Sequence, residues 1–173
     1  MDFKNIFTKG GNSFLYFNII VYNNFSNFIL KLMNHKFEQI SVESGFMKHN
    51  GGLLFKTISE NEYEFKTIIT ENHLNSAGIT HGGFIAAVVD AGAGTAAHRV
   101  AAGSPCVTIS LELKFIFAVH LGQELIGNTK IQKKTKSMVF LTCELTAENK
   151  IVATASGVWK ILNNKLPEAG PGG

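Results

Sequence analysis

One helix of this sequence begins with residues suited to binding a carbonyl oxygen or an anion. The pattern predicts a helix from His81 to Ala101, with Thr80 as its N-cap and His81, Gly82 and Gly83 in its first turn. A helix N-terminus presents unpaired N–H groups that carry partial positive charge. Glycine lets a ligand approach that backbone closely. Gly82 and Gly83 are therefore candidate substrate-binding residues, although the same glycines would also permit close packing of the helix on a sheet.

A carboxylate lies in the middle of the same helix, in apolar surroundings. Asp90 follows Ala86-Ala87-Val88-Val89 and precedes Ala91-Gly92. Burying a carboxylate without a partner costs several kcal/mol, so the pattern favours a functional acid over a solvated helix face. His81 and Asp90 are nine residues apart, so they point to opposite sides of the helix, roughly 13.5 Å apart along its axis. They can meet only across a two-fold axis, which predicts a homodimer with two equivalent sites at its interface.

The elements predicted around this helix form an α+β pattern. Alternation of apolar and polar residues indicates strands on both sides of the helix, with one short helix before them. The ranges are 35–47 for the short helix, 53–59 and 62–70 for the first two strands, and 107–117, 123–133, 137–147 and 150–161 for the later four. Gly92 and Gly94 each cost about 1 kcal/mol relative to alanine inside a helix, and close approach of a sheet would offset that cost. We therefore expect an antiparallel sheet wrapped around one long helix.

Composition and length limit the classes of protein that remain. The chain has 173 residues, of which 45% are hydrophobic and 17% charged, which excludes a mainly disordered chain. A net charge of +3 is too small to argue for a nucleic-acid partner, and no apolar run is long enough for a transmembrane span. The histidines show no metal-ligand spacing, so no metal is expected. Cys106 and Cys143 form no CxxC pair; free thiols would suit the cytoplasm, and a disulfide between them remains an alternative.

Three segments are expected along the chain. Residues 34–162 would form the folded domain, and residues 163–173, rich in proline and glycine, a flexible tail. Residues 1–33 are an N-terminal extension rich in Phe and Asn. This extension has three interpretations: an added helix packed on the domain, a weak membrane-surface anchor, or translated upstream sequence ahead of a start at Met33.

The stretch from Asn75 to Asp90 resembles a motif of hotdog-fold acyl-CoA thioesterases of the phenylacetate-degradation (PaaI-like) type. That family pattern is N-x(5)-H-G-G-x(6)-D/E, and all of it is present here at the right spacing, with His81 as its histidine. The resemblance covers about residues 36–161, including the order of the strands. It implies a hotdog fold, in which an antiparallel sheet wraps around one long central helix.

The resemblance also implies a role for each matching residue. Asn75 and the backbone N–H of Gly82 would hold the thioester carbonyl, with His81 supporting that pocket. Asp90 of the other subunit would activate water as a general base or attack as a nucleophile. Thr108 matches a position whose hydroxyl helps to orient the water. The reaction would be hydrolysis of an acyl-CoA to a free acid and coenzyme A, which belongs to the substrate, so no separate cofactor is implied.

Lysines of a predicted hairpin are candidates for the phosphates of coenzyme A. Lys133 and Lys136 flank the turn between two strands, and a solvated hairpin tip is the alternative. Two other functions remain open: a hotdog hydratase or dehydratase acting on acyl thioesters, and a non-catalytic acyl-CoA binding protein. The exposed sheet face of a dimer commonly stacks in this family, so the expected assembly is a dimer of dimers, that is, a homotetramer.

Overall fold

The structure of the protein is a computed structural model that describes residues 36–162. The predictions for the N-terminal extension (1–33) and for the C-terminal tail (163–173) concern residues outside this range. Within the described range, no helix has the length and apolar character needed to cross a bilayer.

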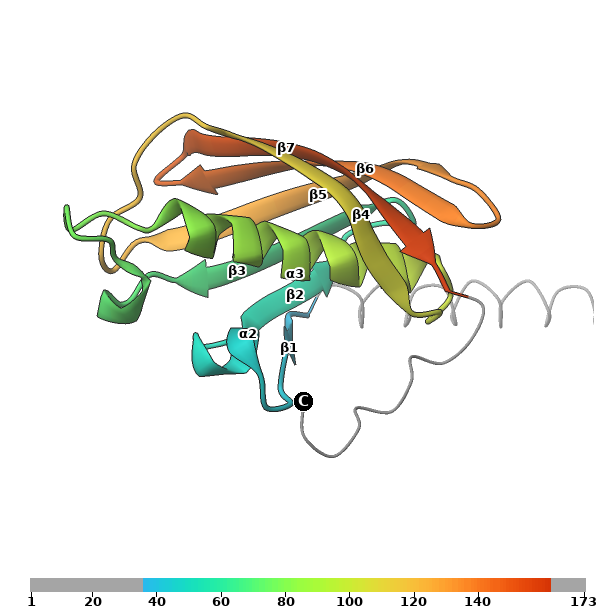
Figure 1. Cartoon of the computed structure of the whole chain (residues 1–173), viewed down its shortest axis with the longest axis horizontal. Helices are drawn as coiled ribbons and strands as arrows, with labels where there is room; N and C mark the ends of the chain where they lie inside the picture. Colours follow the sequence, from blue (N-terminus) through green and yellow to red (C-terminus); the bar gives the residue numbers. More distant parts are fainter. Residues whose placement is uncertain (1–35, 163–173) are drawn as a thin grey trace, which may run out of the picture. The chain divides into compact units, whose positions relative to one another are not determined.

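In residues 36–162, seven strands form one antiparallel sheet (Figure 1). The strands are β1 (Glu38–Ile40), β2 (Leu53–Thr57), β3 (Glu62–Ile68), β4 (Cys106–Phe115), β5 (Glu124–Lys134), β6 (Met138–Ala147) and β7 (Lys150–Ile161). Their order across the sheet is β1-β2-β3-β5-β6-β7-β4. Within this sheet β4 is an edge strand that pairs with β7 only, and β1 forms the opposite edge. The six strands predicted from alternation, and the α+β class, are confirmed.

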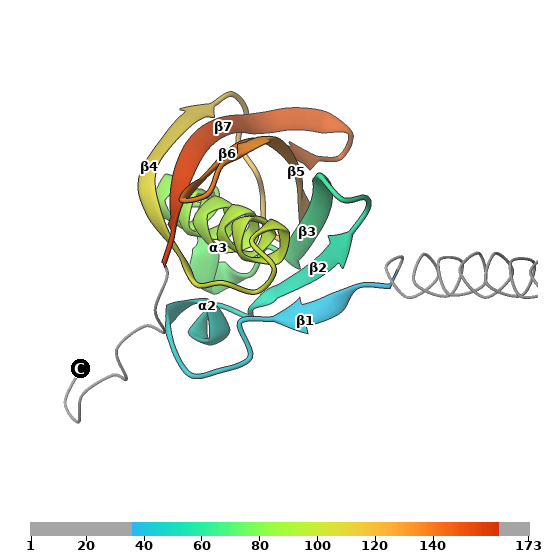
Figure 2. The same cartoon turned by 90° about the vertical axis from the view of Figure 1, so that its right-hand side faces the viewer.

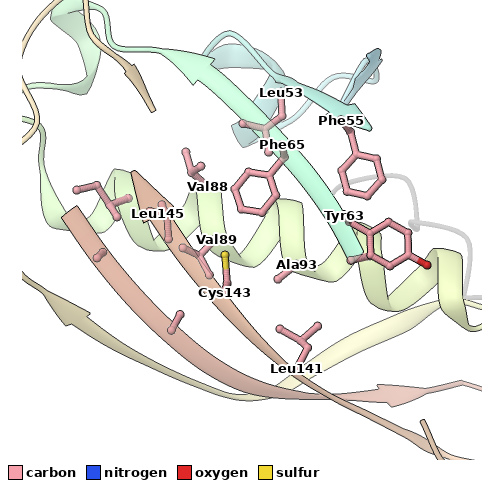
Figure 3. Packing of buried hydrophobic residues seen from close by; sticks show 14 of the residues in the cluster. Leu53, Phe55, Tyr63, Phe65, Val88, Val89, Ala93, Leu141, Cys143 and Leu145 are labelled. Carbon is pink, nitrogen blue, oxygen red and sulfur yellow. The ribbon is translucent and has the colours of Figure 1, made fainter. Parts of the chain in front are cut away.

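The long helix α3 (Gly82–Val100) lies in the concave face of the sheet, which curves around it when viewed along the helix (Figure 2). Its buried side chains include Val88, Val89 and Ala93, which face the strand residues Phe65 and Leu145 (Figure 3). This packing forms the core of the domain and holds the start of α3 in a fixed place relative to the strands.

The two glycines in the middle of α3 allow the close approach that the sequence predicted. A Cβ atom added at Gly92 would lie 2.3 Å from the ring of Phe65, and one added at Gly94 would lie 3.3 Å from Nε1 of Trp159. Trp159 is only 1% exposed and packs under the helix. The small Gly94 leaves room for the indole against α3.

The helix predicted over residues 35–47 is absent. Its place is taken by strand β1 and by the short helix α2 (Phe46–His49). The spacing of Phe37 and Ile40 matched a helical face, but β2 offers hydrogen-bonding partners, and β1 pairs with it in antiparallel register. Backbone pairing to an existing sheet outweighs a weak local helical preference.

Candidate active site

The start of α3 is capped by His81, not by Thr80. The Nδ1 atom of His81 accepts a hydrogen bond from the Gly83 N–H at 2.8 Å. Thr80 is buried, and its N–H and its hydroxyl both donate to the carbonyl of Val119, so its side chain is not free to cap the helix. A Cβ atom at Gly83 would lie 2.9 Å from Nδ1 of His81, so glycine is needed here for the cap to form. Within residues 36–162, the N–H of Gly82 donates to no protein group.

Asn75 presents its amide N–H₂ group beside this helix start. Its Oδ1 atom accepts hydrogen bonds from the N–H groups of Ala77 (2.9 Å) and Ile79 (3.3 Å). Because the oxygen is occupied by the loop, Nδ2 is left as a donor that makes no hydrogen bond within the described part of the chain. The site thus offers two free donors, Nδ2 of Asn75 and the backbone N–H of Gly82.

A pocket of about 320 Å³ lies next to these two donors. Asn75 and Gly82 line it together with apolar residues of α3 and of the segment that ends β4 and follows it. The ring of Phe115 covers Gly82, with Cζ 3.5 Å from the position that a Gly82 Cβ would occupy. The other lining residues are Ile79, Thr80, Ile85, Ile116, Phe117, Ala118 and Val119. An apolar wall opposite two hydrogen-bond donors suits a group that has an apolar part and one carbonyl oxygen.

Asp90 and Thr108 form a second polar pair, outside that pocket. The hydroxyl of Thr108, on β4, donates to Oδ1 of Asp90, on α3, at 2.6 Å. Both residues are exposed in the single chain, so the apolar surroundings expected for Asp90 are not found there. The bulge in the pairing of β4 with β7 falls immediately after Thr108. The hydrogen bond orients the carboxylate and leaves Oδ2 open to a water or a substrate.

The remaining candidates lie away from the pocket. Lys133 and Lys136 are exposed at the hairpin between β5 and β6, at the opposite end of α3 from Gly82 (Figure 1). One chain therefore does not bring the lysines, the Asp90 pair and the two donors together. Cys106 and Cys143 are both free thiols, which decides against the disulfide.

His73 has a structural role that the sequence did not predict. It is a buried histidine, and burial lowers the pKa of its imidazole, while a hydrogen bond with the carbonyl of Asn50 opposes that shift. The only sequence signal for this role was the position of His73 two residues before Asn75.

Comparisons with known proteins identify sequences and structures to which this chain is similar. The sequence profile of the thioesterase superfamily matches residues 77–154. A Pseudomonas aeruginosa protein assigned as an esterase is 34% identical over 94 residues, which are 54% of this chain and 70% of that protein. Human acyl-coenzyme A thioesterase 13 is 28% identical over 87 residues, which are 49% of this chain and only 62% of that enzyme. The Escherichia coli PaaI protein from the phenylacetic acid degradation operon superposes with a TM-score of 0.61 at 19% identity, covering 66% of this chain and 82% of that one.

The structural similarity and the sequence similarities support different conclusions. At 19% identity the PaaI structure shows the fold alone, and it confirms the hotdog arrangement predicted from the sequence. The similarity to the Pseudomonas protein extends over more than two thirds of that protein and overlaps the matched profile. The chain therefore belongs to the thioesterase superfamily, and it is a hydrolase that acts on thioester bonds.

Proposed function

We propose that the protein hydrolyses acyl-CoA thioesters at two equivalent active sites, each built from both subunits of a homodimer. The observation that carries this proposal is the separation of two complementary half-sites along β4. The pocket with the two donors lies at the end of the strand, at Phe115, and the Asp90 pair lies near its start, at Thr108. His81, which caps α3 beside the pocket, and Asp90 are nine residues apart and point to opposite sides of the helix, roughly 13.5 Å apart along its axis, too far for one chain to use both half-sites on one thioester.

The free edge of β4 favours a second copy as its partner. An exposed edge strand with apolar side chains is a surface that proteins normally cover. Large apolar residues on β4 and just after it are about half exposed in the single chain: Ile109 at 56%, Phe115 at 57%, Ile116 at 49% and Phe117 at 61%. Antiparallel pairing of two β4 edges across a two-fold axis would set the start of one strand beside the end of the other. Asp90 of one subunit would then face the pocket of its partner.

The chemistry follows from the two half-sites. Asn75 and the Gly82 N–H would donate to the thioester carbonyl oxygen and stabilise the negative charge that it gains as water attacks the carbon. His81, held by the Gly83 N–H, fixes the position of these donors. Asp90, oriented by Thr108, would take a proton from the attacking water. Collapse of the tetrahedral intermediate would break the carbon–sulfur bond and release coenzyme A as the thiol; direct attack by Asp90 is the other route.

Surface lysines, the outer sheet face and two free thiols extend the proposed function. Lys133 and Lys136 would bind the phosphates of coenzyme A, and the reaction would need no metal or separate cofactor. A homotetramer would have to form through the outer sheet face, where Phe140 and Val158 lie among polar residues such as Ser156. The free thiols favour a reducing compartment, and we propose the cytoplasm.

Thiol release from a panel of acyl-CoAs tests this function. We expect the wild type to hydrolyse at least one acyl-CoA, and Asp90→Asn to lower kcat by about 100-fold or more. Glu144→Gln, the same chemical change on an exposed carboxylate of β6, is the matched control and keeps wild-type activity. Absence of thiol release from every acyl-CoA would overturn the function, and hydratase and binding assays would follow. Equal activity of Asp90→Asn and wild type would remove Asp90 from the mechanism.

Mixing two inactive variants tests the shared site. Asp90→Asn keeps the donor pocket, and Asn75→Ala keeps the carboxylate. If subunits exchange at random, half of the dimers are mixed and each mixed dimer regains one intact site, so activity returns to about a quarter of the wild-type value. No recovery, with mixed dimers shown to form by mass spectrometry, would mean that each site lies within one chain.

A further inference from the structure

His73 is a buried histidine that none of the proposed chemical steps uses. Its side chain is 3% exposed, and it ends the 3-10 turn Glu71–His73, just before the loop that carries Asn75. Its ring lies nearly parallel to the ring of Phe84, with ring centroids 3.7 Å apart and an interplanar angle of 9°. Phe84 belongs to the first turn of α3, so the imidazole packs directly against the helix start that carries Gly82.

The hydrogen-bonding partners of this imidazole select one neutral tautomer. Nδ1 lies 3.1 Å from the backbone nitrogen of Thr70, which can only donate a hydrogen bond. Nε2 lies 3.1 Å from the carbonyl oxygen of Asn50, which can only accept one. Nδ1 must therefore be unprotonated, and Nε2 carries the proton. A second proton, on Nδ1, would point at the N–H of Thr70, so two buried donors would face each other without an acceptor. Protonation of His73 therefore breaks its hydrogen bond with Thr70.

The backbone of His73 is tied to the same helix start. Its carbonyl accepts a hydrogen bond from the N–H of His81 at 2.7 Å, which closes the base of the loop 73–81. The next residues inward, Leu74 and Thr80, form an isolated antiparallel bridge. One residue thus anchors both ends of the loop: Asn75 follows it by two positions, and His81 is bound to its carbonyl.

Few other titratable groups face this position. A pocket of about 470 Å³ on the outer side of the turn is lined by His73 together with His49, Lys66 and Glu124. Lys66 and Glu124 form an ion pair with each other at 2.8 Å. On its own segment, Glu71 belongs to the same turn. His81 lies across the base of the loop, and His49 provides a histidine control outside the proposed active site.

We propose that His73 is a positioning residue: its neutral imidazole holds the Asn75 loop and the first turn of α3 in the geometry that binds the thioester carbonyl, and its protonation lowers turnover. This inference rests on the proposed function for its kinetic test. It goes beyond that function by assigning a role to a residue that does not touch the substrate.

The sign of the pH effect follows from burial. Burial lowers the pKa of His73 below its usual 6.5, and the hydrogen bond to Asn50 opposes this shift. The folded state therefore favours the neutral imidazole relative to the unfolded chain. The stabilisation is complete above about pH 6.5 and is lost as the pH falls from there through the lower pKa of the folded state. Over the same pH range, the donors that bind the thioester carbonyl should lose their active arrangement.

The kinetic test compares full-length wild type with His73→Asn and with the control His49→Asn. Asparagine can offer an oxygen to the Thr70 N–H but does not titrate. At pH 7.5 we expect His73→Asn to lower kcat by about tenfold and to change KM by less than about twofold, because small displacements of catalytic groups act mainly on the transition state. Between pH 6.5 and 5, kcat of wild type and of His49→Asn should fall, whereas kcat of His73→Asn should stay level. Wild-type kcat in His73→Asn, or the same fall with pH in all three proteins, would overturn the proposal.

A second readout needs no turnover. In NMR titrations of the wild type, the backbone amide resonances of Gly82 and Gly83 should shift with the same midpoint as the His73 imidazole. If these amides stay constant while His73 titrates, the positioning role is wrong, whatever the activity. If they follow His73 but no acyl-CoA is hydrolysed, the positioning of the helix start stands and the proposed function fails.

Discussion

Replacing Gly92 by alanine should destabilise the protein, although alanine is the better helix former. The new Cβ would lie 2.3 Å from the ring of Phe65. That ring cannot move away, because on its other side a Cβ at Gly127 would lie only 2.2 Å from it, so the ring fills the space between the two glycines. Overpacking of a core costs about 1–3 kcal/mol, and we expect the upper end here. The gain of about 1 kcal/mol in helix propensity offsets part of it and leaves a loss of about 2 kcal/mol.

Gly94→Ala is the matched control, since it has the same gain in helix propensity two residues along the same helix. Its Cβ would lie 3.3 Å from Trp159 Nε1, so a shift of a few tenths of an ångström accommodates it. We expect this variant to be within about 1 kcal/mol of wild type. The two variants should then differ by about 10 °C in Tm when unfolding is followed by circular dichroism at equal protein concentration. If Gly92→Ala is as stable as Gly94→Ala, the close contact with Phe65 does not constrain the helix.

Two further measurements test other features of the structure. Ile109→Asp places a charge on the exposed edge of β4, so we expect sedimentation to show monomers and thiol release to be lost; an intact dimer would mean that the subunits associate elsewhere. In the folded protein, one thiol per chain, that of Cys106, should react with a thiol reagent at pH 8, because burial raises the pKa of Cys143 to about 12. Both thiols should react in guanidinium chloride, and rapid reaction of two thiols without it would contradict the burial of Cys143.

Local sequence patterns were sufficient to predict those helices and strands that bury one face and expose the other. The alternation that marks β5, β6 and β7 arises because one face of each strand packs on α3 and the other meets solvent. The Ala- and Gly-rich composition of α3 likewise indicated close packing, which Phe65 and Trp159 provide. The short β1 could not be predicted in this way, because a three-residue strand depends on the pairing that β2 offers.

Some features of the candidate site could likewise be predicted from the sequence, whereas others depend on tertiary contacts. The types and spacing of Asn75, His81 and Asp90 were readable from the chain alone, because a motif is a local property and the nine-residue spacing on a helix already keeps His81 from Asp90. Which donors remain free, and which are used by the fold, was decided only by tertiary contacts: the carbonyl of Val119 takes both donors of Thr80, and His81 therefore caps the helix. The role of His73 was equally hidden from the sequence, since its partners become neighbours only when the chain folds.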